Sequence, residues 1–132
     1  MITTHSFFIP GIPRPQGSKR SIGNGRLIEQ SKQLPAWRQQ VARFAKQHCT
    51  QQFESEVHLT LHFVMPRPAR MKRTLPMTAR PDVDKLARAV LDGLTGVTFG
   101  DDSQVTQLTA TKRRAELDEL PGVHITCTGE LP

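Results

Sequence analysis

The sequence predicts a single α+β domain, in which a small sheet, mainly antiparallel or mixed, carries two principal helices. Residues 56–65 alternate between apolar and polar side chains, residues 35–49 and 84–95 repeat apolar residues at helical spacing, and further Thr- and Val-rich stretches follow. The chain has 132 residues, which suits one domain with its own core. We therefore expect one domain over residues 1–132, with about four or five strands.

The N-terminal part predicts a strand and a loop before the first helix. Residues 6–9, SFFI, predict a short strand that stops at a proline. Residues 10–20 are rich in Pro and Gly and contain three basic residues, which is typical of a loop. The pair Asn24-Gly25 then predicts the turn of a small hairpin.

A helix is predicted over residues 35–49, because Pro35 suits the first turn of a helix. Behind it, Trp37 and the apolar residues that follow recur at helical spacing and form one apolar face. Trp37 is therefore expected to anchor the core rather than to stack on a base.

Residues 56–65, EVHLTLHFVM, predict a strand with one apolar and one polar face. His58 and His62 share the polar face, but four residues along a strand span roughly 13 Å, which is too far to chelate one ion. We expect both to be surface histidines.

The rest of the chain predicts a helix, a connection and two strands. Between residues 84 and 95 the apolar side chains gather on one helical face, opposite the charged ones. Residues 95–104 form a connection and residues 104–114 a strand. After a turn at 116–122, residues 123–128 are predicted to form its partner strand.

Charge favours a polyanionic partner. The net charge is +6 and the pI is about 10.0, and each phosphate that a basic residue neutralises releases a counterion. Residues 66–81 carry five basic residues and no acidic residue. They predict an arm that follows a phosphate backbone, with a solvated loop as the alternative.

Other function classes are excluded or disfavoured. The sequence has no Walker loop, no zinc-finger spacing and no dinucleotide-binding glycine pattern. No run of about 18 apolar residues occurs, so we expect no membrane span and no membrane partner. Cys49 and Cys127 are expected to be free thiols, which suits a cytoplasmic location.

Two aspartates, Asp82 and Asp84, stand before the second predicted helix in an otherwise basic chain. If the backbone stays extended through Asp84, both carboxylates project from the same side. Mg²⁺ takes such oxygen ligands together with waters and phosphate oxygens, and Asp101 or Asp102 can supply a third carboxylate. The ion would lower the pKa of a bound water and neutralise charge on a phosphate, which suits phosphodiester hydrolysis.

Plainer roles for the same residues stay open at this point. Asp82 and Asp84 suit the start of a helix, where carboxylates cap amide groups. The later Asp-Asp pair is a common turn signal. Arg88 either pairs with Asp84 and Asp92 on a solvated face or reaches the site and stabilises negative charge.

The segment 80–105, RPDVDKLARAVLDGLTGVTFGDDSQV, resembles the signature of the RusA family of Holliday junction resolvases, which is common in phages and prophages. That pattern contains a basic residue, D-x-D-N, a lysine four residues after the second aspartate, D-x-L and later D-D-x-Q-V. Asp82 and Asp84 match the first pair, residues 92–94 match D-x-L, and residues 101–105 match the last block. The opening PGIPRPQGSKR also resembles the Pro-rich start of the family.

The resemblance implies a RusA-like fold and a Mg²⁺-dependent endonuclease that resolves four-way junction DNA by paired symmetric nicks, in recombination and repair. Its three catalytic and metal-binding acids fall on Asp82, Asp84 and Asp102. Its catalytic lysine falls on Arg88, which keeps the charge but cannot donate a proton near neutral pH. Lys85 stands where the family has Asn and is expected to face the DNA.

The resemblance also implies a homodimer, and a two-fold dimer suits a junction because it presents identical sites to two strands. Three rival functions remain open: a DNA-binding module without catalysis, a metal-dependent phosphohydrolase on nucleotides or other branched DNA, and a structural protein whose acids only cap. The candidate phosphate contacts are all basic: Lys19, Arg20, Arg67, Arg70, Lys72, Arg73, Arg80, Lys85, Lys112, Arg113 and Arg114.

Overall fold

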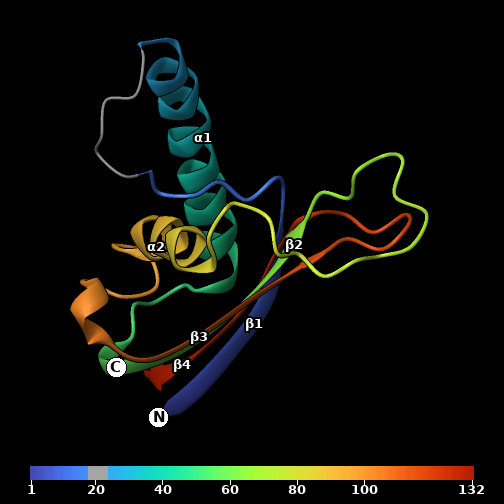
Figure 1. The fold of residues 1–132 in the computed structure, drawn as a ribbon. Helices are drawn as coiled ribbons and strands as arrows, with labels where there is room; N and C mark the ends of the chain where they lie inside the picture. Colours follow the sequence, from blue (N-terminus) through green and yellow to red (C-terminus); the bar gives the residue numbers. More distant parts are fainter. Residues whose placement is uncertain (18–23) are drawn as a thin grey trace.

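The structure is a computed structural model that describes residues 1–17 and 24–132. Lys19 and Arg20, two of the predicted phosphate contacts, lie outside the described residues. Figure 1 shows the path of the chain. In chain order, the elements are β1 (Ile2–Pro10), α1 (Asn24–His48), β2 (Glu54–Met65), α2 (Val83–Leu94), the 3₁₀ helix η1 (Asp102–Gln104), β3 (Val105–Arg114) and β4 (Gly122–Glu130).

The strands of the described chain form one mixed sheet in the order β1-β4-β2-β3. β4 pairs antiparallel with both β1 and β2, whereas β2 and β3 pair parallel. The parallel pair requires a crossover, and α2 provides it. The predicted α+β class, with a mixed sheet and two principal helices, is therefore confirmed.

One predicted strand pairing is wrong. Residues 123–128 belong to β4, which pairs with β1 and β2 rather than with the strand before it in the chain. The physical reason lies in β2, whose apolar face is buried along its length, so that it takes a central place with a neighbour on each side. β3 has no buried residue and lies at the sheet edge.

The first helix also differs from the prediction, because α1 begins at Asn24 and Pro35 lies inside it. The predicted hairpin turn at Asn24-Gly25 is therefore wrong. Asn and Gly are favoured in hairpin turns but also at helix N-termini, so this local signal fits both structures. The predicted strand 6–9 is part of the longer β1, and the remaining predicted strands and the helix of residues 84–95 agree closely in their bounds with the observed elements.

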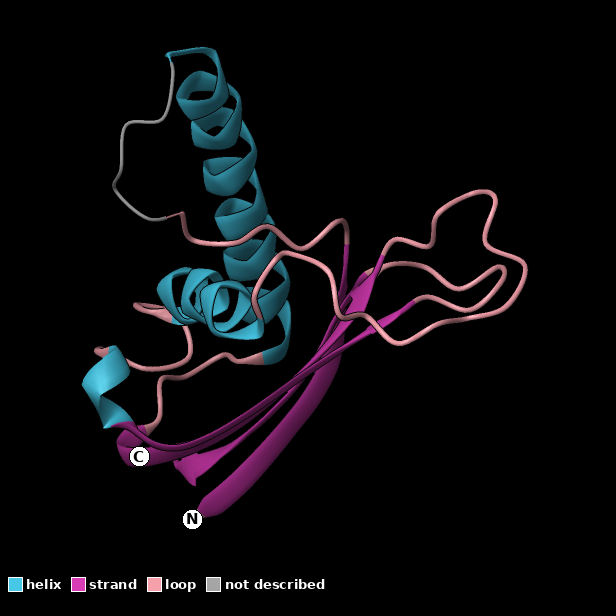
Figure 2. Cartoon of the chain, in the orientation of Figure 1, coloured by secondary structure: helices cyan, strands magenta, loops and turns pink. Residues whose placement is uncertain are grey.

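Both helices lie on one face of the sheet (Figure 2). Between the layers, apolar residues of α2 such as Leu86 and Val90 are buried in the same core as Leu61 and Phe63 of β2. Trp37 is buried in this core as well, which confirms its predicted role. Within the described residues, no helix has the length and apolar character needed to cross a bilayer.

The two helices approach each other closely at Gly93. A Cβ atom added there would lie 2.9 Å from Val41 Cβ of α1, a distance that real Cβ contacts essentially never show. The packing of α1 on α2 therefore requires glycine at this position. In the same core, Cys49 and Cys127 are buried free thiols, as predicted.

Two long connections leave the sheet beyond the carboxyl ends of β2 and β3. Residues 66–81 and 115–121 run side by side there (Figure 1), and we call them together the two-loop lobe. The hydroxyl of Thr74 donates to Glu116 Oε2 at 2.7 Å and so joins the two loops. Arg67 donates to Thr74 and, at 2.9 Å, to the carbonyl oxygen of Met71, which ties the first loop to itself.

Candidate active site

Asp82 and Asp84 lie at the start of α2, and both are exposed. Asp82 occupies the N-cap position with an extended backbone, but its side chain makes no capping hydrogen bond. Its Oδ2 atom instead lies 3.5 Å from Lys85 Nζ. Asp84 lies in the first turn of the helix, where the helix dipole stabilises a carboxylate.

An extended backbone through Asp84 would have placed both carboxylates on one side. The backbone is extended at Asp82 but helical from Val83, so this condition is not met. The helix begins at Val83, so strand geometry does not align the two carboxylates. What the two residues share is one helix start. The carboxylate of Asp82 is nevertheless not occupied by capping.

The second acidic block has a different construction. Asp101 caps η1: its Oδ1 accepts from Ser103 N at 2.9 Å, and Gln104 Oε1 accepts from Asp101 N at 3.1 Å. The bond from the Ser103 amide lowers the pKa of the Asp101 carboxyl below its usual value. Asp102 beside it is exposed. The turn-signal interpretation thus applies to Asp101.

Gln104 also attaches this block to the sheet. Its Nε2 atom donates to the carbonyl oxygens of Phe53, at 3.1 Å, and Ser55, at 2.9 Å. Ser55 lies near the start of β2 and Phe53 directly precedes the strand, so η1 lies at the amino end of β2. The match of Gln104 to the D-D-x-Q-V block is the one sequence signal that points to this anchor.

The two acidic blocks lie at opposite ends of β3. At its carboxyl end, Lys112 Nζ donates to Pro81 O at 2.8 Å, directly before Asp82. At its amino end, Val105 follows η1. A strand rises about 3.3 Å per residue, so Val105 and Lys112 are about 23 Å apart.

That separation is far beyond the span of one ion, whose oxygen ligands lie about 2 Å from it. In agreement, the described part of the chain contains no group of three or more His, Cys, Asp or Glu side chains that could hold a metal ion. One chain therefore does not bring Asp102 to Asp82 and Asp84. Their assignment as catalytic acids stays a prediction.

Arg88 is exposed on α2, one turn after Asp84. Within the described residues it forms no ion pair with Asp84 or Asp92. Asp92 instead lies 3.5 Å from Arg38 of α1, and Arg38 also donates to Gln16 Oε1 at 3.4 Å. The solvated-face pairing with Asp92 is thus not what the structure contains, and Arg88 is available to a substrate.

Among the predicted phosphate contacts that the structure describes, Lys85 and Arg114 are half-buried: Lys85 lies beside Asp82, and the Nε atom of Arg114 is buried without a hydrogen-bond partner. The others fall into two groups. Arg67, Lys112 and Arg113 are half-buried and bonded within the protein. Arg113 holds Glu119 through two bonds of 2.7 Å and donates to His62 Nε2 at 3.0 Å, so His62 is half-buried rather than a free surface histidine. The exposed group consists of Arg70, Lys72, Arg73 and Arg80, all on the first loop of the two-loop lobe.

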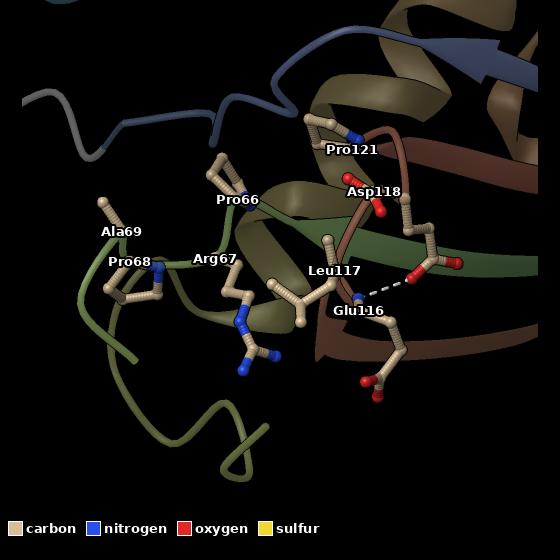
Figure 3. A pocket seen from close by; sticks show the side chains of 10 residues that line it. Pro66, Arg67, Pro68, Ala69, Glu116, Leu117, Asp118 and Pro121 are labelled. Atoms are coloured by element: carbon tan, nitrogen blue, oxygen red, sulfur yellow. Dashed lines mark hydrogen bonds between the residues drawn. The ribbon is translucent and has the colours of Figure 1, made fainter. Parts of the chain in front are cut away.

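A hollow of about 360 Å³ lies between the two loops of the lobe (Figure 3). Its wall includes Arg67 from one loop and Glu116, Asp118 and Glu119 from the other. None of the predicted catalytic residues lines it. Three carboxylates also make it unsuitable for a phosphate backbone, because like charges repel.

A protein-family model described as Endodeoxyribonuclease RusA matches residues 10–128. The chain belongs to the RusA endodeoxyribonuclease family. No curated protein matches it closely enough to be compared. The RusA match covers nearly the whole chain and both acidic blocks, and nucleases of this family depend on a divalent metal ion.

Proposed function

We propose that this RusA family member is a Mg²⁺-dependent nuclease that resolves four-way DNA junctions by paired symmetric nicks, in recombination and repair. Family membership supports the endodeoxyribonuclease chemistry. The observation that carries the proposal is the exposed pair Asp82 and Asp84 at the start of α2, with the Asp82 side chain free of capping. Exposed cations on the neighbouring loop, residues 66–81, suit a DNA backbone.

The donor chemistry of this pair fits Mg²⁺, which takes one or two carboxylates and keeps waters and phosphate oxygens as its other ligands. When bound, the ion lowers the pKa of a coordinated water and neutralises charge on the scissile phosphate. Asp82 and Asp84 would hold it. Lys85 and Arg88 would bind phosphate oxygens, and Arg88 acts by charge alone because its guanidinium keeps its proton.

The third acid comes from a partner subunit in this proposal. Within one chain, Asp102 and Asp82 are separated by the length of β3, which supports a site shared between two copies. A two-fold axis across β3 would exchange the ends of this strand. The Asp102 of each copy would then approach the Asp82 and Asp84 of the other.

The outer edge of β3 is suited to such pairing. β3 is an edge strand, and residues 106–111 carry no charge, proline or glycine to block the addition of another strand. Leu108, at the middle of this stretch, is 43% exposed. An antiparallel pair centred on Leu108 would set Gln104 opposite the partner's Lys112, which brings η1 beside the partner's α2.

Mixed dimers test this arrangement. Asp82→Asn and Asp102→Asn should each bind a synthetic junction and fail to cleave it. A mixed dimer of the two variants contains one shared site with both substitutions and one with neither, so it should nick one strand of the junction. The measurement is product formation after co-expression with two affinity tags and purification of the doubly tagged dimer.

The matched control is a mixed dimer of Asp82→Asn and Asp84→Asn. Both substitutions then fall at the same end of β3, so every shared site is damaged and no product is expected. If the Asp82–Asp102 mixture is as inactive as this control while the wild type cleaves, the shared site is wrong. If the wild type binds junctions but gives no product with any divalent metal, the DNA-binding module without catalysis is favoured.

Substrate choice separates the remaining rival. A Mg²⁺ titration should be run in parallel on a four-way junction, a flap, a linear duplex and free nucleotides. We expect metal-dependent product from the junction at protein concentrations that leave the duplex intact. Faster hydrolysis of flaps or nucleotides would identify a different phosphohydrolase.

A further inference from the structure

Lys112 occupies an unexpected position for a basic residue of a DNA-binding protein. It lies on β3 opposite Phe63 of β2, and Phe63 is completely buried in the core between sheet and helices. Paired residues of parallel strands project to the same face of the sheet, so Lys112 points toward the helices. Its side chain is half-buried.

The ammonium group of Lys112 is bound to the backbone. Nζ donates to Ala79 O at 2.7 Å and to Pro81 O at 2.8 Å. A lysine ammonium has three donors, so two of the three are used within the protein. Such charge-assisted bonds are roughly twice as strong as neutral ones, and a phosphate contact would have to replace them.

The two acceptors lie in the turn that leads to the acidic pair. Ala79 and Pro81 flank Arg80, and Asp82 follows directly as the N-cap residue of α2. The preceding loop, residues 66–76, has no helix or strand of its own to fix this turn. Lys112 therefore links the turn before α2 to the sheet, directly before Asp82 and Asp84.

We propose that Lys112 is a positioning residue for the metal-binding acids: it fixes the turn 79–81, and through it Asp82 and Asp84, rather than contacting DNA. The inference rests on the proposed function, because it assigns Lys112 a task in that same site. It replaces the expectation, based on charge alone, that Lys112 binds phosphate.

The test compares Lys112→Met, which keeps the side-chain length and removes the donors, with the wild type. Mn²⁺ affinity, measured by electron paramagnetic resonance without DNA, should fall by about 10-fold or more, as expected for loss of a group that orients metal ligands. Junction binding should stay within about twofold, since no phosphate contact is lost. Lys112→Arg, which keeps the charge and the donors, should recover most of the Mn²⁺ affinity.

Two further variants separate the roles. Lys46→Met removes one charge from an exposed position on α1 and should leave Mn²⁺ affinity unchanged. Lys72→Met removes an exposed cation of the two-loop lobe and should weaken junction binding. If Lys112→Met weakens junction binding as Lys72→Met does and keeps wild-type Mn²⁺ affinity, the proposal is overturned.

The wild-type protein gives a second measurement that needs no variant to fold. In spectra of the ¹⁵N-labelled lysine ammonium groups, Lys112 should show slowed proton exchange before DNA is added and little change afterwards, whereas Lys72 should shift. A shift of Lys112 equal to that of Lys72 would overturn the proposal. Mn²⁺ affinity is measured without DNA. If the wild type does not cleave junctions, the proposed function is wrong, but the Mn²⁺ affinities of Lys112→Met and the wild type can still be compared.

Discussion

The two acidic blocks of this protein use similar residues in different ways. At the start of α2, Asp82 occupies the N-cap position but its side chain makes no capping hydrogen bond, and its carboxylate lies beside Lys85. At η1, Asp101 is held by Ser103 and by Gln104 in a reciprocal capping box. At the start of α2 both carboxylates are exposed. At η1 the carboxylate of Asp101 stabilises the turn, and Asp102 beside it is exposed.

This difference shows how an acidic residue becomes available to a ligand. A capping aspartate uses one carboxylate oxygen for the amide groups of its own helix, which leaves fewer of its lone pairs for a cation. At α2, a lysine from the sheet fixes the turn instead, so Asp82 is not needed for that purpose. At η1, among the described residues, no cation from another element holds the turn, and the side chain of Asp101 stabilises it instead.

The largest effect should separate the neighbours Asp101 and Asp102. Asp102→Ala should lower single-turnover junction cleavage by about 10³-fold, because a lost metal ligand removes several kcal/mol of charge stabilisation. Asp101→Ala should keep most of the cleavage rate and lower the melting temperature by a few degrees, since it removes a cap. The measurements are a cleavage time course and a thermal melt for each variant.

The opposite pattern of cleavage rates and melting temperatures would contradict these roles of Asp101 and Asp102. If Asp101→Ala abolishes cleavage without affecting the melting temperature, Asp101 is the ligand and its cap is incidental. Asp101→Asn provides a matched control, because an amide oxygen can still accept from Ser103 N. It should restore the melting temperature of the wild type.

A smaller effect is expected at Arg88, on the helix that separates the two blocks. Arg88→Ala should reduce cleavage by about 10- to 100-fold at saturating protein, since it removes one positive charge near the scissile phosphate. Arg88→Lys, which introduces the residue of the family pattern, should retain most of the rate. A wild-type rate for Arg88→Ala would place Arg88 on a merely solvated face.

Much of this fold could be predicted from the sequence because its periodic elements are driven by burial. The alternation in β2 and the apolar face of α2 both persist in the structure, where Leu61 and Val90 are completely buried. Signals that depend on one or two residues were less reliable. Asn24-Gly25 suits a hairpin turn and a helix start equally well, and only the surrounding chain decides between them.

The residues of the candidate site could be proposed from the sequence, but their geometry could not be predicted. The spacing of Asp82 and Asp84 marks the first acidic block, and its metal-binding role stays a prediction. The position of Asp102 depends on the parallel pairing of β2 with β3, which no local pattern reveals. Lys112 was predicted as a phosphate contact because its charge is visible in the sequence, whereas its bonds to Ala79 and Pro81 join segments far apart in the chain.

The turn after β3 contains a third acidic segment, and the smallest effect is expected there. In the turn after β3, Glu119 accepts two bonds from Arg113 and one from Glu116 N. The Arg113 guanidinium is the main reason that the pKa of the Glu119 carboxyl is lowered from 4.5 to about 2. Like Asp101, this carboxylate stabilises its own turn and is not offered to a ligand.

A carboxyl whose pKa is lowered by folding stabilises the protein above its unfolded pKa, and this contribution disappears as the pH falls through the folded pKa. The melting temperature of the wild type should therefore fall between pH 4.5 and pH 2 partly because of Glu119. Glu119→Gln should lower the melting temperature slightly at pH 7 and weaken its dependence on pH in that window. Asp118→Asn, which removes the same charge from a left-handed position that asparagine tolerates, should keep the wild-type dependence. If Asp118→Asn and Glu119→Gln flatten the acid limb equally, net charge explains the effect and the paired carboxylate does not.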